Sequence, residues 1–257
     1  MEIKKLGENS RPLICLPLVG RTRSGILIEL SQLLAKGPDL VEWRADFFCG
    51  IDEVEAVVEL GREIKERAGD VPVIFTIRSE AEGGEKVGLS AWERIKLNAK
   101  IAAETGIEYL DCELANEKEQ IEFLRSVAQK EHGKKIIGSF HQHEYTPNTE
   151  ILCEKIFQAE TLGLDVAKIA VMPQNRQDVL VLWDALLTAG EKTGIPIIAI
   201  SMGKYGLISR LAGGIFGSAV TFAVGVDSSA PGQVAIEDVR AVLEIIEKNN
   251  RALRNGE

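Results

Sequence analysis

The sequence is poor in basic charge and has no long apolar run. Its 257 residues hold 30 Lys and Arg against 39 Asp and Glu, so the formal net charge is −9. A chain this acidic is poorly suited to nucleic acid or to an anionic membrane surface. No apolar run approaches the roughly 18 residues that cross a bilayer. We therefore expect neither nucleic acid nor a membrane among its partners.

Cysteine is also scarce, and its spacing excludes paired ligands. The four cysteines are far apart: Cys15, Cys49, Cys112 and Cys153. Two of them, Cys15 and Cys112, lie inside apolar stretches, where a free thiol packs as a small hydrophobic group. The N-terminal segment 1–20 is charged and then only briefly apolar, unlike a secretory signal. These features predict a cytoplasmic protein without structural disulfides or a zinc site.

What the chain does have is a regular alternation of short apolar runs and amphipathic segments of helical length. The predicted strands are Leu13–Leu18, Leu40–Arg44, Val73–Ile77, Tyr109–Glu113, Lys135–Phe140, Val166–Val171, Ile197–Ser201 and Val220–Val224. The predicted helices are Ile26–Ala35, Val54–Arg67, Ala91–Thr105, Lys118–Glu131, Glu150–Leu162, Gln177–Thr193, Leu207–Ile215 and Ile236–Asn249. Eight pairs over 257 residues give about 32 residues per pair, with no Pro/Gly/Ser-rich linker between them.

Eight such units suit a closed barrel better than an open doubly wound sheet. The sequence therefore predicts the α/β class and a single (β/α)8 TIM barrel, forming one catalytic domain over residues 1–257. In such a barrel the chemistry gathers at the C-terminal ends of the strands. Polar residues at those ends are the candidates for a functional site.

Lys168 lies inside the predicted apolar strand Val166–Val171. Desolvating an ammonium is costly, so a lysine in such a strand is rarely buried without a reason. Burial lowers the pKa of the amine, and a neutral amine attacks a ketone or aldehyde to form a Schiff base. A salt-bridged core lysine, or one that reaches water at a strand edge, is the alternative from this strand alone.

Two of the three histidines, His141 and His143, lie at the end of the preceding strand, while His132 lies in a helical tail. A spacing of two puts both rings on one face of a strand, and imidazole transfers protons near neutral pH. Asp111 and Glu113 share this spacing on another strand, so a divalent-metal site is a second interpretation. The third is a pair of loop histidines without a function.

Charged residues at other strand ends suit a polar substrate. Glu42 and Arg44 share one face of their strand, where opposite charges either bind a polyhydroxylated substrate or neutralise each other. Arg78 ends the third strand. Glu82 follows on a loop bounded by Gly83 and Gly84, where its carboxylate either orients an imidazole or faces solvent.

Arg210 follows the seventh strand, and Ser229–Gln233 follows the eighth. An arginine beside hydroxyl and amide donors suits a carboxylate or a phosphate. The nearby glycines match no phosphate-loop motif and are typical of tight turns. We expect an anion site here, and we expect Arg78 and Arg210 to hold down the pKa of a partly desolvated Lys168.

Seven segments spread over nearly the whole chain fit one known family. They are Glu42-Trp43-Arg44-Ala45-Asp46, Thr76-Ile77-Arg78-Ser79 with Glu82-Gly83-Gly84, Ser139-Phe140-His141, Lys168-Ile169-Ala170-Val171-Met172-Pro173-Gln174, Ile200-Ser201-Met202-Gly203, Ser209-Arg210-Leu211-Ala212-Gly213 and Ser229-Ala230-Pro231-Gly232-Gln233. Together they resemble the type I 3-dehydroquinate dehydratases of the shikimate pathway. The segments around Lys168 and Ser229 are the most specific.

The resemblance implies a (β/α)8 barrel, acting as a homodimer, that dehydrates 3-dehydroquinate to 3-dehydroshikimate without a metal or other cofactor. It implies that Lys168 forms a Schiff base with the C3 ketone, whose iminium acidifies the C2 proton before syn elimination of the C1 hydroxyl as water. His141 matches the general acid/base and Glu82 the carboxylate that positions it. Arg210 resembles the carboxylate clamp. The substrate-binding positions it implies are Glu42, Arg44, Arg78, Met202, Arg210, Phe222, Ser229 and Gln233.

One position departs from the family pattern. Asp-Phe usually follows the catalytic histidine, whereas this chain has Gln142-His143. From its place in the motif we assign the acid/base role to His141 and expect His143 on the outer loop. The glycine-flanked segment Glu80–Gly88 is expected to act as a lid.

The alternative enzyme is a class I Schiff-base aldolase, which also uses a barrel lysine. Such enzymes for sugar phosphates need a phosphate nest near the last two strands, where Ser229–Gln233 looks suited to a carboxylate. A metal-dependent lyase built on His141, His143, Asp111 and Glu113 is a further alternative. The last is a barrel that binds a carboxylate without catalysis.

Overall fold

The eight apolar runs form eight parallel strands. In the computed structural model, which describes residues 2–4, 11–130, 133–227 and 229–254, five strands have the predicted bounds. The strands are β1 (Leu13–Leu18), β2 (Leu40–Arg44), β3 (Val73–Thr76), β4 (Tyr109–Glu113), β5 (Lys135–Gln142), β6 (Val166–Val171), β7 (Ile197–Ser201) and β8 (Val220–Phe222). Every residue of seven of these strands is buried, as expected for parallel strands covered on both faces.

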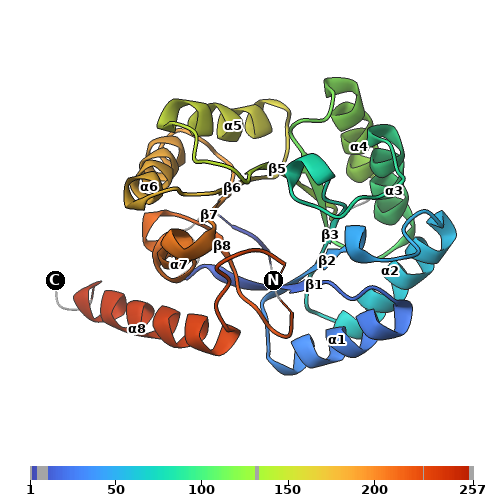
Figure 1. The fold of residues 1–257 in the computed structure, drawn as a ribbon, viewed down its shortest axis with the longest axis horizontal. Helices are drawn as coiled ribbons and strands as arrows, with labels where there is room; N and C mark the ends of the chain where they lie inside the picture. Colours follow the sequence, from blue (N-terminus) through green and yellow to red (C-terminus); the bar gives the residue numbers. More distant parts are fainter. Residues whose placement is uncertain (1, 5–10, 131–132, 228, 255–257) are drawn as a thin grey trace.

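A helix follows each strand (Figure 1). The helices are α1 (Arg23–Ala35), α2 (Val54–Ala68), α3 (Ala91–Glu104), α4 (Lys118–Lys130), α5 (Thr149–Thr161), α6 (Arg176–Gly190), α7 (Gly203–Ala212) and α8 (Ile236–Arg254). Short 3-10 turns are η1 (Ala45–Phe47), η2 (Glu80–Glu82) and η3 (Gly213–Phe216). Side chains satisfy the first N–H groups of several helices, as Asn148 does for α5. The predicted end of the fourth helix, Glu131, and His132 lie outside the described residues.

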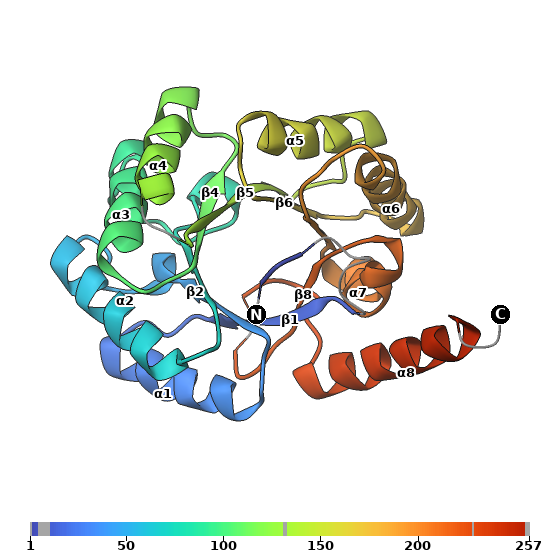
Figure 2. The same cartoon turned by 180° about the vertical axis from the view of Figure 1, so that it is seen from behind.

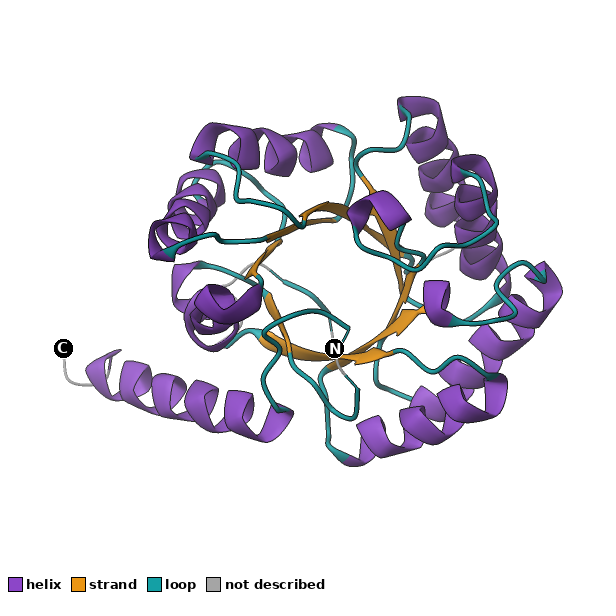
Figure 3. Cartoon of the chain, in the orientation of Figure 1, coloured by secondary structure: helices purple, strands orange, loops and turns teal. Residues whose placement is uncertain are grey.

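The strands pair in the order β7-β6-β5-β4-β3-β2-β1-β8. A parallel bridge between Ile197 of β7 and Ser218, just before β8, brings the two ends of the sheet together. Figure 3 shows the resulting ring of strands with the helices outside it. The prediction of a single (β/α)8 TIM barrel is confirmed.

Apolar side chains fill the space inside the barrel and the layer between strands and helices. Cys15 belongs to the inner cluster and Cys112 to the outer one, as predicted, and all four thiols are free. Across the described residues no helix is both long and apolar enough to cross a membrane.

Residues 2–4 close the end of the barrel where the strands begin. The buried Ile3 donates its N–H to Tyr109 Oη, at the start of β4, over 2.9 Å. Figure 2, which shows the molecule from behind, places the N-terminus over the ring of strands. The opposite end, where the strands finish, is left for the functional site.

Candidate active site

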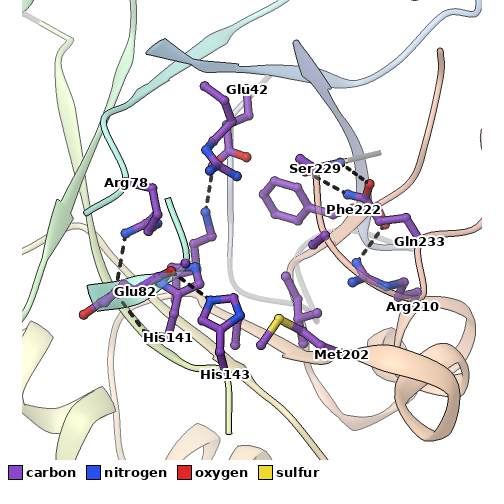
Figure 4. A pocket seen from close by; sticks show the side chains of 16 residues that line it. Glu42, Arg78, Glu82, His141, His143, Met202, Arg210, Phe222, Ser229 and Gln233 are labelled. Atoms are coloured by element: carbon purple, nitrogen blue, oxygen red, sulfur yellow. Dashed lines mark hydrogen bonds and ion pairs between the residues drawn. The ribbon is translucent and has the colours of Figure 1, made fainter. Parts of the chain in front are cut away.

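A pocket lies at the C-terminal ends of the strands, the usual place of the active site in a (β/α)8 barrel. All eleven residues that the family resemblance assigns to the site line it: Glu42, Arg44, Arg78, Glu82, His141, Lys168, Met202, Arg210, Phe222, Ser229 and Gln233. Figure 4 shows ten of its side chains with labels, among them His143. Gly83, Ala170, Ile200 and Ala230 complete the wall.

Lys168 points into the barrel from the middle of β6 and is only 3% exposed. Its Nζ lies 2.8 Å from Glu42 Oε1 and 3.1 Å from Asp111 Oδ2. The same ammonium lies 4.8 Å from the centre of the Phe222 ring, a cation–π arrangement. The lysine is therefore both salt-bridged and part of the pocket wall, combining two interpretations that the sequence left open.

The expectation that the pKa of Lys168 is held down is wrong. Burial and the nearby Arg78 do lower this pKa, but Glu42 and Asp111 outweigh them and raise it above its ordinary value. Arg210 does not lie among the groups that set it. Lys168 is thus an ammonium at neutral pH, and it has to lose a proton before it can act as a nucleophile.

Glu42 and Arg44 do not neutralise each other. Glu42 pairs with Lys168, whereas Arg44 makes two hydrogen bonds to Asp46, with Nε–Oδ1 and Nη2–Oδ2 distances of 2.8 and 2.7 Å. Asp46 was not among the predicted site residues, although its opposite charge two residues after Arg44 was a usable signal. Asp46 also accepts the backbone N–H of Arg78, over 3.3 Å, so it fixes β2 against the end of β3.

Arg78 is the centre of a buried charge cluster. Its Nη2 lies 2.8 Å from Asp111 Oδ2, and its Nη1 lies 3.0 Å from Glu113 Oε1 and donates to Ser139 Oγ over 2.9 Å. Burial raises the pKa of Asp111, but Arg78 and Lys168 beside it lower that pKa to about 2. Asp111 and Glu113, proposed above as metal ligands, therefore serve as partners of cations.

The described residues contain no group of three or more His, Cys, Asp or Glu arranged to hold a metal ion.

Ser139 is a further member of the buried charge cluster around Arg78, and it was not among the predicted site residues. It lies two residues before His141 on β5, and its hydroxyl donates to Asp111 Oδ1 over 2.6 Å. Its position on the same strand face as His141 was the available signal.

His141 is hydrogen-bonded to Glu82 through both its ring and its backbone. A single carboxylate oxygen, Glu82 Oε2, lies 2.9 Å from His141 Nδ1 and accepts the backbone N–H of His141 over 3.1 Å. Burial lowers the pKa of His141 well below its ordinary value and raises that of Glu82 to about 8. We infer a neutral imidazole that donates from Nδ1 to Glu82, which leaves Nε2 with a lone pair and able to accept a proton.

His143 does not lie on an outer loop, contrary to expectation. It follows β5 directly, lines the pocket, and places its Nε2 2.8 Å from the carbonyl oxygen of Glu82. Its ring is nearly parallel to that of His141, with centroids 6.3 Å apart. The spacing of two had predicted that both rings share a face. The ladder between β5 and β6 continues to Gln142, which carries His143 to the pocket wall.

Arg210, on α7, is a buried cation without a carboxylate. It is 2% exposed, and its Nη1 and Nη2 donate to the carbonyl oxygens of Phe222 and Pro231 over 3.1 and 3.2 Å. Among the described residues it has no acidic partner, its Nε has no hydrogen bond, and burial alone lowers its pKa to about 10. This end of the pocket is suited to an anion.

The segment after β8 closes over this cation. Ser229 donates its backbone N–H to Gln233 Oε1 over 2.9 Å, and Gln233 Nε2 donates to Ser229 Oγ over 3.2 Å. Met202 and Phe222 are buried and supply the apolar wall, as the sequence predicts. The pocket thus combines an amine, an imidazole pair and an anion site (Figure 4).

Comparison with known proteins gives one consistent result. The family model described as type I 3-dehydroquinase matches residues 14–250. A protein of Aromatoleum aromaticum named 3-dehydroquinate dehydratase is 48% identical over 238 residues, which cover 93% of this chain and 91% of that protein. One from Geobacillus sp. with the same name is 47% identical over 239 residues, covering 93% and 92%.

Solved structures agree with the sequence matches. The crystal structure of 3-dehydroquinate dehydratase from Geobacillus kaustophilus superposes with a TM-score of 0.90 at 44% identity, covering 92% of this chain and 91% of that one. The type I enzyme from Clostridium difficile, solved with covalent modified comenic acid, gives a TM-score of 0.89 at 38% identity and covers 94% of each chain. This chain belongs to the type I 3-dehydroquinase family.

Proposed function

We propose that this protein dehydrates 3-dehydroquinate to 3-dehydroshikimate through an imine on Lys168. The observation that carries the proposal is a buried lysine that faces a pocket with a neutral imidazole, His141, and an arginine that has no carboxylate partner among the described residues. The name shared by relatives 47% and 48% identical supports the substrate. The covalently modified ligand of the Clostridium difficile enzyme supports covalent chemistry in this fold.

Arg210 is proposed to bind the carboxylate of the substrate. The chain carries a net charge of −9, so an anion is captured by local rather than overall charge. An unpaired guanidinium in a closed site makes strong charge-assisted hydrogen bonds to a carboxylate. With that group fixed at Arg210, the ring of the substrate extends toward Lys168. Glu42, Arg44 and Arg78 are proposed to bind its hydroxyl groups or shape the site, and Met202 and Phe222 to contact its apolar face.

The first chemical step requires a free amine. We propose that on substrate binding the Lys168 ammonium gives a proton to Nε2 of the neutral His141, and that its Nζ then attacks C3 of the ketone. The carbinolamine loses its hydroxyl as water, with a proton from His141, which leaves an iminium. Glu42 and Asp111, 2.8 and 3.1 Å from Nζ, stabilise this cation as they stabilise the ammonium.

The iminium draws electrons from the neighbouring carbon and makes the C2 proton acidic. The neutral Nε2 of His141 is proposed to take this proton and to give it to the C1 hydroxyl, which leaves as water. Water then adds to the iminium, releases 3-dehydroshikimate and returns Lys168 to its amine. The net change is the loss of one water molecule, and the route uses only side chains of this protein. The cytoplasmic location predicted from the cysteine usage and the homodimer implied by the resemblance both stay predictions; the mass in solution tests the latter.

The test is borohydride reduction in the presence of 3-dehydroquinate, followed by intact mass and peptide mapping. We expect an adduct on Lys168 that needs both borohydride and substrate, together with turnover of untreated protein. Turnover without an adduct would retain the dehydration and reject the imine. The absence of both, with activity on aldol substrates, would favour the class I aldolase.

A further inference from the structure

His143 lies in the pocket wall, yet the proposed chemistry gives it no task. Its Nε2 is 2.8 Å from the carbonyl oxygen of Glu82. A carbonyl oxygen only accepts hydrogen bonds, so Nε2 carries the proton of this contact. His143 therefore donates to the backbone of the residue whose carboxylate holds His141 (Figure 4).

Gly83 leaves the room for this contact. Its φ is +81°, and a Cβ at this position would lie within 2.8 Å of three atoms of the His143 ring. A side chain at position 83 would therefore displace the ring, in addition to the strain of the left-handed backbone. The ring packs directly on the backbone of the turn that carries Glu82.

Glu82 is consequently held from β5 at both its carboxylate and its carbonyl group. The carboxylate accepts from His141 N and Nδ1, and the carbonyl accepts from His143 Nε2. The backbone hydrogen bonds of the turn itself stay within residues 79–84: they join Glu82 N to Ser79 O, Gly83 N to Glu80 O and Gly84 N to Ser79 O. His141 in β5 and His143 directly after it thus attach Glu82 to the barrel, beside the contacts of Ser79 N–H with Glu113 Oε1 (2.7 Å) and of Arg78 Nη1 with Glu82 Oε2 (3.5 Å).

We propose that His143 is a positioning residue, whose Nε2–H fixes the backbone of Glu82 so that the Glu82 carboxylate holds His141 in its working orientation. The inference rests on the proposed acid/base function of His141. The anion site at Arg210 is built by α7 and the segment after β8, so it does not depend on this contact. Loss of His143 is therefore expected to slow the chemical step and to leave substrate affinity in place.

The experiment compares His143→Phe with His143→Gln. Phenylalanine keeps a ring but has no donor, whereas glutamine carries an amide N–H at a similar distance from its Cα. We expect H143F to lower kcat about 3- to 10-fold, the effect of one lost hydrogen bond, with KM within about twofold of the parent. H143Q is expected to recover most of kcat. Gln142→Ala, between the two histidines and outside the pocket lining, is the control and is expected to match the parent.

A second readout does not depend on turnover. Nitrogen-15 spectra of the imidazoles are expected to show His143 protonated at Nε2 and His141 at Nδ1 in the parent. In H143F the Nδ1–H of His141 is expected to exchange faster with water, and in H143Q to stay protected. This comparison separates a failure of the inference from a failure of the proposed dehydration.

Several results would overturn the inference. Parent-like kcat in H143F would do so, and so would an H143Q variant as slow as H143F, because the ring and not its donor would then matter. A loss confined to KM would also contradict it. An unchanged His141 Nδ1–H in H143F would contradict it whether or not the protein dehydrates the substrate. Melting temperatures of the three variants show whether each is folded.

Discussion

Replacing Arg210 by methionine separates binding from stability. Both Arg210 and Arg78 are buried, at 2% and 3% exposure, but Arg78 contacts three carboxylates while Arg210 contacts only carbonyl oxygens. A buried charge that is paired in the fold is costly to unpair, whereas an unpaired one is itself a cost. We therefore expect Arg210→Met to weaken substrate binding with little loss of stability, and Arg78→Met to lower the free energy of unfolding much more.

The structure gives the size of the effect on stability. Burial lowers the pKa of Arg210 to about 10, so keeping its charge at neutral pH costs the fold about 3 kcal/mol. Its two hydrogen bonds to carbonyl oxygens offset this by about 1–1.5 kcal/mol each. Because these contributions nearly cancel, R210M is expected to change the free energy of unfolding by less than about 2 kcal/mol. R78M leaves buried carboxylates unpaired and is expected to cost about 3–5 kcal/mol.

Substrate binding, unlike stability, is expected to suffer strongly in R210M. Loss of two charge-assisted hydrogen bonds to the substrate carboxylate, at about 1.5–3 kcal/mol each, is expected to raise KM about 10²–10⁴-fold in R210M. Urea denaturation measures the stability of both variants, and steady-state kinetics with 3-dehydroquinate measures KM. If R210M were as unstable as R78M, or if its KM stayed within about threefold of the parent, Arg210 would not be an unpaired anion-binding cation.

Three further predictions follow from the remaining groups. Lys168→Met is expected to abolish the borohydride-trapped adduct, as read by intact mass, because no other nitrogen is proposed to form the imine. His141→Ala is expected to slow kcat about 10²–10⁴-fold while an adduct is still trapped on longer incubation, because the variant forms the imine more slowly but keeps the Lys168 nucleophile. Because burial holds the pKa of His141 well below 6.5, this group stays neutral, and we expect kcat/KM to show no fall from protonation of His141 as the pH falls through 6.5. Glu42→Gln removes a carboxylate that raises the pKa of Lys168, so any rise of kcat/KM with ammonium deprotonation is expected at lower pH than in the parent.

The barrel itself was predictable because its strands are short, mostly apolar segments that alternate with amphipathic helices. The bounds of β1, β2, β4, β6 and β7 follow from the sequence, although β2, β4 and β6 carry charged site residues such as Glu42, Asp111 and Lys168. β5 and β8 end at other residues than predicted because their ends pair with segments that are distant in the sequence. β5 continues past Phe140 because His141 and Gln142 pair with Ala170 and Val171 of β6.

After β8 the chain pairs with a segment outside the barrel sheet. Val224, predicted as the last residue of the strand, bridges to Ala235 of the segment that precedes α8. The helix α7 also begins earlier than predicted, at Gly203, whose φ of +64° is a conformation that glycine adopts without strain. Apolar periodicity gives no signal for a helix start of this kind.

The candidate site was predictable in its members and not in its pairings. Most charged residues of the site were found from their place within or after a strand, but Lys168 and Glu42 lie 126 positions apart, and only the register of the sheet brings them to 2.8 Å. The sequence therefore suggested a lysine with a lowered pKa, while the carboxylates that raise it come from β2 and β4. The position of His143 likewise depends on how far β5 pairs with β6.

The arrangement of charge fixes how an anionic substrate can lie. Arg44, Arg78 and Lys168 each have carboxylate partners from the barrel, so that end of the pocket is nearly balanced. Arg210 alone has no such partner among the described residues, so the carboxylate of a substrate is drawn to the opposite side of the pocket. A carbonyl group in the same molecule then faces the one amine that can form an imine. Glu42 and Asp111 already lie beside Lys168. A substrate bound the other way round would place its carboxylate next to these two, and repulsion between the three anions disfavours that orientation.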